Sequence, residues 1–227
     1  AGAQCFLLVC SVIRLTCSGL VSNVNVGVMS QGVMHKRPSN LSATLAKQRL
    51  CDGHERYRAN RPEAFFHQNA KRESSLKDQQ PYAVVLTCSD SRVCPEVVFD
   101  AGIGQVFTIC IAGNIVDQFV TASVEYACLY LGVNLVVVLG HQHCGAVQAA
   151  LDGLNTECHL DALLDKIKTT IKFSDQDTNV DVEQCIRVHA IAGARTLVSS
   201  KPVLSMLGDQ GLQILPAFYH LKDGQVE

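Results

Sequence analysis

Two apolar stretches of the sequence end in side chains that can bind a metal. The first, VVLTCSDSRVCPE, runs from valine and leucine into Cys88, Asp90, Arg92 and Cys94. The second, LVVVLGHQHCGAV, runs from a similar apolar segment into two histidines and a cysteine. Thiolate and imidazole are ligands that zinc favours. The chemistry open to the chain therefore depends on whether these two ends meet in the fold.

Three of these side chains are enough for an open zinc site. Cys88 follows the first apolar run, while His141 and Cys144 follow the second and are three residues apart. Two thiolates and an imidazole leave a fourth tetrahedral position for water, and the lack of a C-x-x-C pair argues against a zinc finger or ribbon. His143 and Cys94 compete as ligands at this point. Ordinary buried thiols are another alternative, because the chain has eleven cysteines.

An acidic and a positively charged residue lie two residues apart just after Cys88. Asp90 and Arg92 can form a charge-assisted, bidentate pair within a tight turn. Such a pair keeps the carboxylate ionised and fixes its direction. Beside an open zinc position, that carboxylate can accept a hydrogen bond from water or hydroxide, or occupy the position itself. An ion pair that only stabilises the turn is the alternative interpretation.

The hydrophobic pattern predicts an α/β fold that brings the two ends together. Apolar, β-branched runs indicate strands, and helical spacing indicates helices between them. The strands are expected at 82–88, 105–113, 134–141 and 212–221, and the helices at 39–60, 119–132, from 145 onward and at 182–200. Alternation of this kind is typical of a mostly parallel sheet, here of four to five strands flanked by helices. Ligands of such sheets gather beyond the carboxyl ends of the strands, where both motifs lie.

The helix expected at 39–60 is amphipathic. Ser39 or Asn40 is expected to cap its start, since short polar side chains accept hydrogen bonds from the first helical amides. Its contacts with the core are expected at Leu41, Leu45 and Leu50.

Composition excludes some classes of partner. The chain of 227 residues has a formal net charge of −2 and a sequence pI near 6.5, so no basic stripe for nucleic acid is expected. Its eleven cysteines are odd in number and dispersed, which does not fit a compact disulfide framework.

The first 34 residues differ in composition from the rest. AQCFLLVCSVI is a largely apolar stretch of eleven residues, too short for a stable membrane span of roughly 20. The stretch resembles the core of a signal peptide, and an N-terminal arm that packs on a partner subunit is the alternative. A catalytic domain is expected over residues 35–227. Export to the periplasm or outside the cell is expected if residues 1–30 are a signal segment, and a cytoplasmic location otherwise.

The motif C-S-D-S-R, followed about fifty residues later by H-x-x-C-G, resembles the β-class carbonic anhydrases. The stretches PEVVFDAGIGQVF, AGNIV, SVEYA, VVVLGHQHCGAV and FYHLKDGQVE extend the likeness from about residue 45 to the C-terminus. The resemblance implies that family's fold, a Zn²⁺ ion held by Cys88, His141 and Cys144, and a catalytic dyad of Asp90 with Arg92. The implied reaction is the reversible hydration of CO₂ to bicarbonate and a proton. Because the family's active sites lie at subunit interfaces, a homodimer or higher homo-oligomer is expected.

The same resemblance implies residues on the substrate side. Gln79, nine residues before the first ligand, lies where the family often has an amide donor, and Phe107 and Tyr126 align with apolar pocket positions. Cys110 stands where many members have arginine, so subunit contacts there are expected to differ. Val85 stands where members with a regulatory bicarbonate pocket have tryptophan, so a site open to water is expected.

Two other functions stay open at this point. A carbonyl sulfide or carbon disulfide hydrolase would use the same fold and zinc site, and the shape of the access tunnel would decide between the substrates. A non-enzymatic zinc or thiol protein is the more distant alternative. The presence of both Asp90 and Arg92 argues against it.

Overall fold

The computed structural model describes residues 37–63, 72–73, 75–171 and 181–227. The predicted signal segment or arm, residues 1–34, lies outside the described residues. Within the described ranges, no helix is both long and apolar enough to cross a lipid bilayer.

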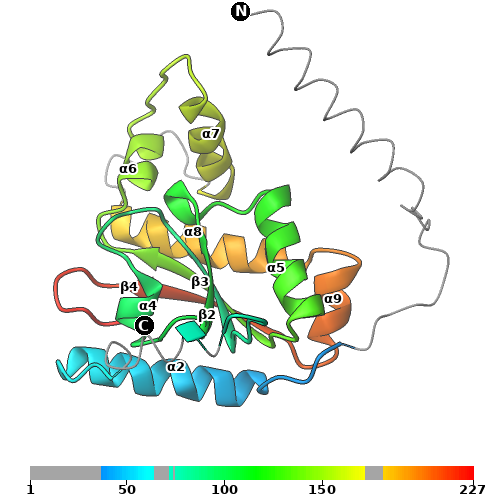
Figure 1. The fold of residues 1–227 in the computed structure, drawn as a ribbon. Coiled ribbons are helices and arrows are strands. Elements are labelled where there is room, and N and C mark those ends of the chain that lie inside the picture. The colour runs from blue at the N-terminus through cyan, green and yellow to red at the C-terminus, as the bar shows by residue number, and fades with distance from the viewer. Residues whose placement is uncertain (1–36, 64–71, 74, 172–180) are drawn as a thin grey trace, which may run out of the picture. The chain divides into compact units, whose positions relative to one another are not determined.

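Four parallel strands of the described chain form one sheet, as the sequence predicts (Figure 1). They are β1 (Ala83–Thr87), β2 (Val106–Cys110), β3 (Leu135–His141) and β4 (Gln213–Tyr219), in the spatial order β2-β1-β3-β4. Every residue of β1 and β3 is buried, because these central strands have helices on both faces. Their uninterrupted valine and leucine runs follow from this burial, while the edge strands β2 and β4 are more exposed.

The predicted helices are present, with boundaries shifted by a few residues. The described helices are α2 (Ala43–Arg58), α4 (Pro95–Val98), α5 (Gln118–Tyr130), α6 (Gly145–Leu151), α7 (Leu160–Thr170), α8 (Val182–Val198) and α9 (Val203–Gly208), with a 3-10 turn, η2 (Ala112–Asn114). Helix α5 follows its cap Asp117, whose carboxylate accepts hydrogen bonds from two amides of the first turn.

Helix α2 begins later than the sequence predicts. Its cap is Ser42, whose side-chain oxygen accepts a hydrogen bond from the Leu45 amide at 3.3 Å. Asn40 does not cap the helix, because its side-chain amide donates to two backbone carbonyls elsewhere, at 2.9 Å each. Leu45 is 58% exposed, so the prediction that it contacts the core is wrong, whereas Leu50 is buried.

Helices cover the sheet on both faces (Figure 1). On one face, α5, α8 and α9 bury one set of alternating strand side chains, which includes Leu86 and Val138. On the other face, α2 and α4 bury the alternate set, which includes Val85 and Val137. This two-sided packing fixes the strand register, since a slip by one residue would exchange the two faces.

A third apolar cluster lies beyond the carboxyl ends of the strands. Helices α6, α7 and α8 contribute to it through Val147, Ile167 and Ile186, and its buried members also include Cys88 and Cys144. The edge of the sheet at which both sequence motifs end is therefore enclosed by helices.

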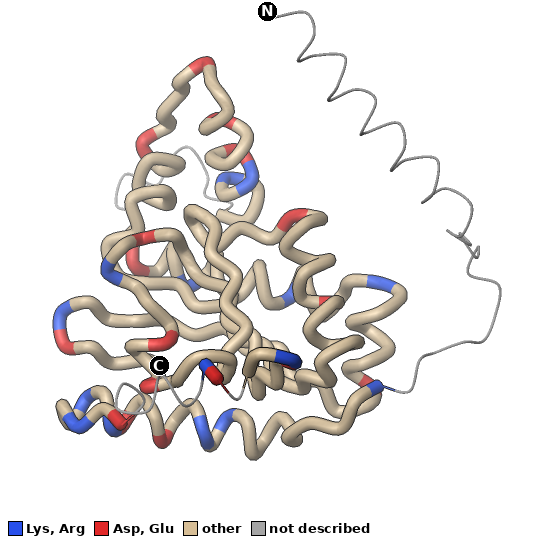
Figure 2. Tube along the Cα trace, in the orientation of Figure 1, with Lys and Arg blue, Asp and Glu red and all other residues tan. Residues whose placement is uncertain are grey.

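Residues of both charge signs are distributed along the described chain (Figure 2). Helix α2 illustrates the mixture, with Lys47, Arg49, Asp52 and Glu55 in close succession. Basic and acidic residues thus occur on the same helix.

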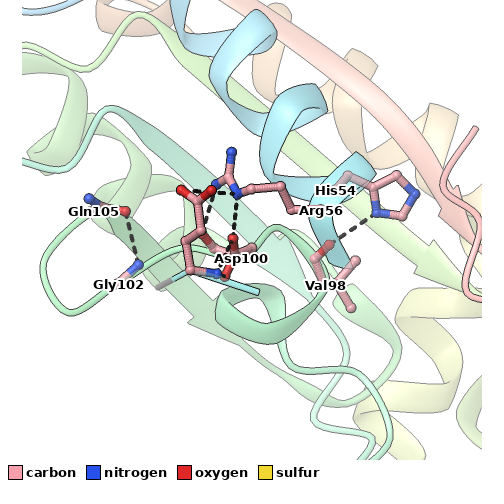
Figure 3. A network of polar contacts seen from close by, with 7 residues as sticks. His54, Arg56, Val98, Asp100, Gly102 and Gln105 are labelled. Carbon is pink, nitrogen blue, oxygen red and sulfur yellow. Dashed lines mark hydrogen bonds and ion pairs between the residues drawn. The ribbon is translucent and has the colours of Figure 1, made fainter. Parts of the chain in front are cut away.

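A buried carboxylate joins α2 to the turn after α4 (Figure 3). The side chain of Asp100 is fully buried and accepts hydrogen bonds from Arg56 Nε at 2.6 Å and from the Glu63 amide at 3.0 Å. Close by, the ring of His54 bonds to the Val98 carbonyl at 3.0 Å. These contacts fix α2 against α4 and the loop that leads into β2.

The substitution Asp100→Asn tests the importance of this carboxylate. Asparagine tolerates the left-handed backbone at this position, where φ is 42°, but its amide NH₂ group would face other donors. We expect the free energy of unfolding to fall by about 2 kcal/mol, because an amide NH₂ group cannot accept and leaves the donors around it without a partner. Urea denaturation gives the measurement.

Asp165→Asn is the matched control for this measurement. Asp165 is exposed and pairs with Lys168 at 3.4 Å on the surface of α7. Its replacement should change the free energy of unfolding by less than about 0.5 kcal/mol. Equal losses of stability in the two variants would contradict the role given to Asp100.

Candidate metal centre

The pairing of β1 with β3 places the two sequence motifs side by side. Thr87, the last residue of β1, lies opposite Leu139 of β3, so Cys88 emerges at the same edge as His141. Cys144 is close behind, since it directly precedes α6. The two sulfur atoms and a ring nitrogen of His141 lie within 4.8 Å of one another, and all three residues are buried.

The imidazole of His141 has one nitrogen without a hydrogen-bond partner. Its Nδ1 lies 3.0 Å from the Gln142 carbonyl oxygen and must donate, since a carbonyl only accepts. In the neutral ring, Nε2 then carries a lone pair, and this atom is buried without a partner among the described residues. An orphaned buried acceptor is costly unless a ligand binds it.

The pKa values of the two thiols are shifted in opposite directions. A hydrogen bond with Cys144 is the main contact that lowers the pKa of Cys88 below its ordinary value, and the Gly113 amide contributes to the same effect. The same hydrogen bond and burial raise the pKa of Cys144 above its ordinary value. One thiolate therefore forms readily, and a divalent cation would favour loss of the second proton as well.

These three donors fit a zinc ion. Two sulfur atoms and an imidazole with a bare nitrogen form a set that zinc binds tetrahedrally, with one position left open. The Gly113 amide of η2 donates to the Cys88 sulfur at 3.2 Å, which supports the thiolate form. Gly113 has a φ of 65°, and a Cβ there would lie 2.7 Å from the Ile167 side chain, so the turn requires glycine.

Asp90 is oriented by Arg92 beside this cluster. Arg92 Nε and Nη2 donate to the two carboxylate oxygens at 2.9 and 2.7 Å, and the Arg92 amide donates at 3.0 Å. These hydrogen bonds hold the pKa of Asp90 well below its ordinary value, so the carboxylate is ionised. Its Oδ2 lies 4.0 Å from His141 Nε2. An ionised acceptor is thus close to the donor set.

The two competing ligands do not join the cluster. His143 is exposed, with a left-handed φ of 57°, and its carbonyl accepts a hydrogen bond from Arg92 at 3.4 Å. Cys94 is exposed at the start of α4, and its thiol lies 3.5 Å from a carboxylate oxygen of Glu96. Neither side chain has the burial that the three clustered donors share.

The three residues expected on the substrate side gather at the other end of β1. The rings of Phe107 and Tyr126 are 6.3 Å apart, and Gln79 and Tyr126 line the same cavity of about 920 Å³. Phe107 pairs with Val84, four residues before Cys88 along the strand. At about 3.3 Å per residue, these four residues separate Phe107 from Cys88 by roughly 13 Å along the strand. A single chain therefore does not bring these residues to its own metal centre.

Some polar side chains near the carboxyl ends of the strands, where the three donors cluster, are not predicted from the sequence. The hydroxyl of Thr87 and both polar side-chain atoms of Asn114 are buried without a hydrogen-bond partner in the described part of the chain. His189 of α8 is buried and contacts the Gly113 carbonyl. In the sequence, the Gly113–Asn114 pair at the end of the second predicted strand indicates the turn. No sequence feature indicates the position of His189, because a lone histidine within an apolar helix says nothing about its contacts.

Comparison with known proteins identifies the family. The carbonic anhydrase family model matches residues 83–226, a range that holds all three clustered donors. Carbonic anhydrase 2 of Mycobacterium tuberculosis is 32% identical over 192 residues, which cover 82% of this chain and 92% of the relative. The carbonic anhydrase of Mycolicibacterium smegmatis is 33% identical over 194 residues, with 83% and 94% covered. The chain belongs to the carbonic anhydrase family.

Solved structures agree with the fold. A tetrameric β-carbonic anhydrase of Sordaria macrospora matches with a TM-score of 0.61 at 24% identity, covering 81% of this chain and 93% of that chain. The β-carbonic anhydrase of Coccomyxa matches with a TM-score of 0.63 at 19% identity, covering 84% and 86%. Together with the four-stranded parallel sheet, these matches confirm the predicted β-class fold.

Serine substitutions test which cysteines hold the metal. Cys88→Ser and Cys144→Ser should reduce the zinc content from about one ion per chain to a small fraction, because a hydroxyl replaces a thiolate poorly as a zinc ligand. Zinc is measured by elemental analysis after dialysis. Cys94→Ser is the matched control and should keep its zinc. Zinc loss in Cys94→Ser, with retention in Cys88→Ser, would overturn the ligand set.

Proposed function

We propose that this protein is a zinc-dependent carbonic anhydrase that catalyses the reversible hydration of CO₂ to bicarbonate and a proton. The observation that carries the proposal is the buried set of Cys88, His141 and Cys144 with an Asp90 oxygen 4.0 Å from the histidine. An open three-ligand zinc site would acidify water, and the oriented carboxylate beside it would accept a hydrogen bond from that water. Membership of the carbonic anhydrase family supports the same reaction.

Each residue of the site has a distinct role in the proposed reaction. Cys88, His141 and Cys144 would hold the ion, and zinc bound in this way acidifies water, so that hydroxide forms near neutral pH. Asp90 would accept a hydrogen bond from water or hydroxide beside the three donors and would thereby orient it toward CO₂. Arg92 keeps the carboxylate ionised and fixed through its two hydrogen bonds.

We further propose that Gln79, Phe107 and Tyr126 act on the substrate from a second copy of the chain. Helix α5 exposes the apolar side chains of Phe119, Tyr126 and Tyr130, an arrangement typical of an interaction surface. This α5 face adjoins the cavity that Gln79 lines, since Tyr126 and Tyr130 belong to both. The tetrameric state of the Sordaria relative supports assembly of this kind. One copy would then supply the metal ligands, and the other copy would supply the residues that contact the substrate.

The substitution Asp90→Asn tests the proposed reaction. The amide would donate to the hydroxide where the carboxylate accepts, so we expect kcat/KM to fall by about 100-fold or more while zinc content stays unchanged. Stopped-flow CO₂ hydration and metal analysis on the same preparations give both values. Asp165→Asn serves as the control and should retain full activity. A zinc-loaded wild type without hydration activity would contradict the proposed function itself.

Mixed oligomers test the contribution of a second copy. Gln79→Ala should lower kcat/KM by about tenfold or more, since it removes one hydrogen-bond donor to the substrate. When Gln79→Ala and Asp90→Asn chains are co-expressed, half of randomly assembled dimers are mixed, and each mixed dimer holds one complete site. We expect about a quarter of wild-type activity in the mixture. Activity no higher than the mean of the separate variants would mean that Gln79 does not act across the interface.

A further inference from the structure

His189 is a buried polar residue with no part in the proposed reaction. It lies in the middle of α8 and is only 2% exposed. Its Nε2 atom lies 2.6 Å from the carbonyl oxygen of Gly113. Because a carbonyl oxygen only accepts, Nε2 must carry a proton and donate it to this bond. The histidine of one helix is thereby joined to the turn η2.

The second ring nitrogen of His189 is fixed by α7. The Thr170 hydroxyl lies 2.5 Å from Nδ1 and 2.6 Å from the Ile167 carbonyl. Burial lowers the pKa of His189, which favours the neutral ring. With its proton on Nε2, that ring has a bare Nδ1. The single hydroxyl proton of Thr170 can be donated to this nitrogen or to the Ile167 carbonyl, not to both. Both nitrogens therefore have a polar group beside them, and the ring is contacted from two sides.

The turn that His189 contacts needs such an external support. Gly113 adopts φ 65° and ψ 17°, and glycine has few steric limits that would keep it there. Its carbonyl bonds to His189, while its amide donates to the Cys88 sulfur at 3.2 Å. The direction of the amide therefore depends on how the rest of the glycine is held. Contacts join Thr170, His189, Gly113 and Cys88 in series, and the two that involve Gly113 are buried.

We propose that His189 is a positioning residue of the metal centre: by holding the Gly113 carbonyl, it keeps the Gly113 amide hydrogen-bonded to the Cys88 sulfur. This inference rests on the proposed function, because it assigns a role toward a metal bound by Cys88. A hydrogen bond to a thiolate withdraws electron density from the sulfur. A metal held by that sulfur would receive less charge from it and would acidify water more strongly. Partners that orient metal ligands typically change metal affinity or activity by about 10- to 100-fold when they are removed.

Cobalt-substituted protein gives a spectroscopic test of this role. Replacing zinc by Co²⁺ produces a thiolate-to-metal charge-transfer band, whose energy falls when the sulfur becomes richer in electrons. We expect His189→Leu to shift this band to lower energy and to lower kcat/KM of the zinc form by about tenfold or more. His189→Gln, whose side-chain amide can still donate to the Gly113 carbonyl, should return both values toward those of wild type. An unshifted band in His189→Leu would overturn the proposal.

Leu197→Ala separates positioning from general stability. Leu197 is buried on the same helix but belongs to the cluster between α8 and the sheet. Its truncation should lower the unfolding temperature and leave the charge-transfer band unchanged. A band shift in Leu197→Ala as large as that in His189→Leu would mean that any loss of packing in α8 disturbs the centre, which contradicts the specific role.

Cadmium-113 provides a direct measurement in case His189→Leu does not fold. Scalar coupling passes through an amide–sulfur hydrogen bond, so the wild-type Gly113 amide proton should couple to ¹¹³Cd bound by Cys88. Thr170→Val keeps His189 but removes the hydroxyl that orients it, and this coupling should weaken. Absence of the coupling in metal-loaded wild type, or an unchanged value in Thr170→Val, would overturn the proposal. Failure of wild type to bind any of these metals would instead contradict the proposed function.

Discussion

The pairing of β1 with β3 is the constraint on which the metal centre depends. Neighbouring strands lie about 4.8 Å apart, and the Thr87–Leu139 register brings Cys88 and His141 to the same edge of the sheet. Burial fixes that register, because every residue of both strands is enclosed by helices and a slip would turn each side chain to the opposite face. The geometry of the donors thus follows from hydrophobic packing along the strands that precede them.

Charge balance is the second requirement at this edge. Asp90 is neutralised by Arg92 from its own turn, whereas Cys88 and Cys144 have the Gly113 amide and each other as partners. Two like charges in one buried cluster disfavour each other, so the second thiolate depends on a cation. The carboxylate is compensated separately. This division leaves Asp90 as an ionised hydrogen-bond acceptor beside the three donors.

The sequence predicts most of the fold because its central strands are apolar throughout and the motif residues follow them directly. Contacts that depend on distant segments are a different matter. Leu45 has the spacing of a core residue, yet α2 turns it to solvent. His189 reaches the Gly113 turn only because α8 packs across the sheet, and nothing near it in the sequence indicates that contact. Gln79 lies far from the donors of its own chain, so its role depends on an assembly that strand and helix patterns do not describe.

The order in which the chain is synthesised has a consequence for the thiols. Strand β4 pairs with β3 along its whole length and completes the sheet, yet residues 145–212 must be made after Cys144 before β4 begins. At roughly 5–20 residues per second, this takes several seconds, and pairing between strands distant in sequence is itself slow. During that interval the donors exist without their finished enclosure. Oxidation or capture of a wrong metal is therefore a greater hazard for the nascent chain than for the folded protein, in which Cys88, His141 and Cys144 are all buried.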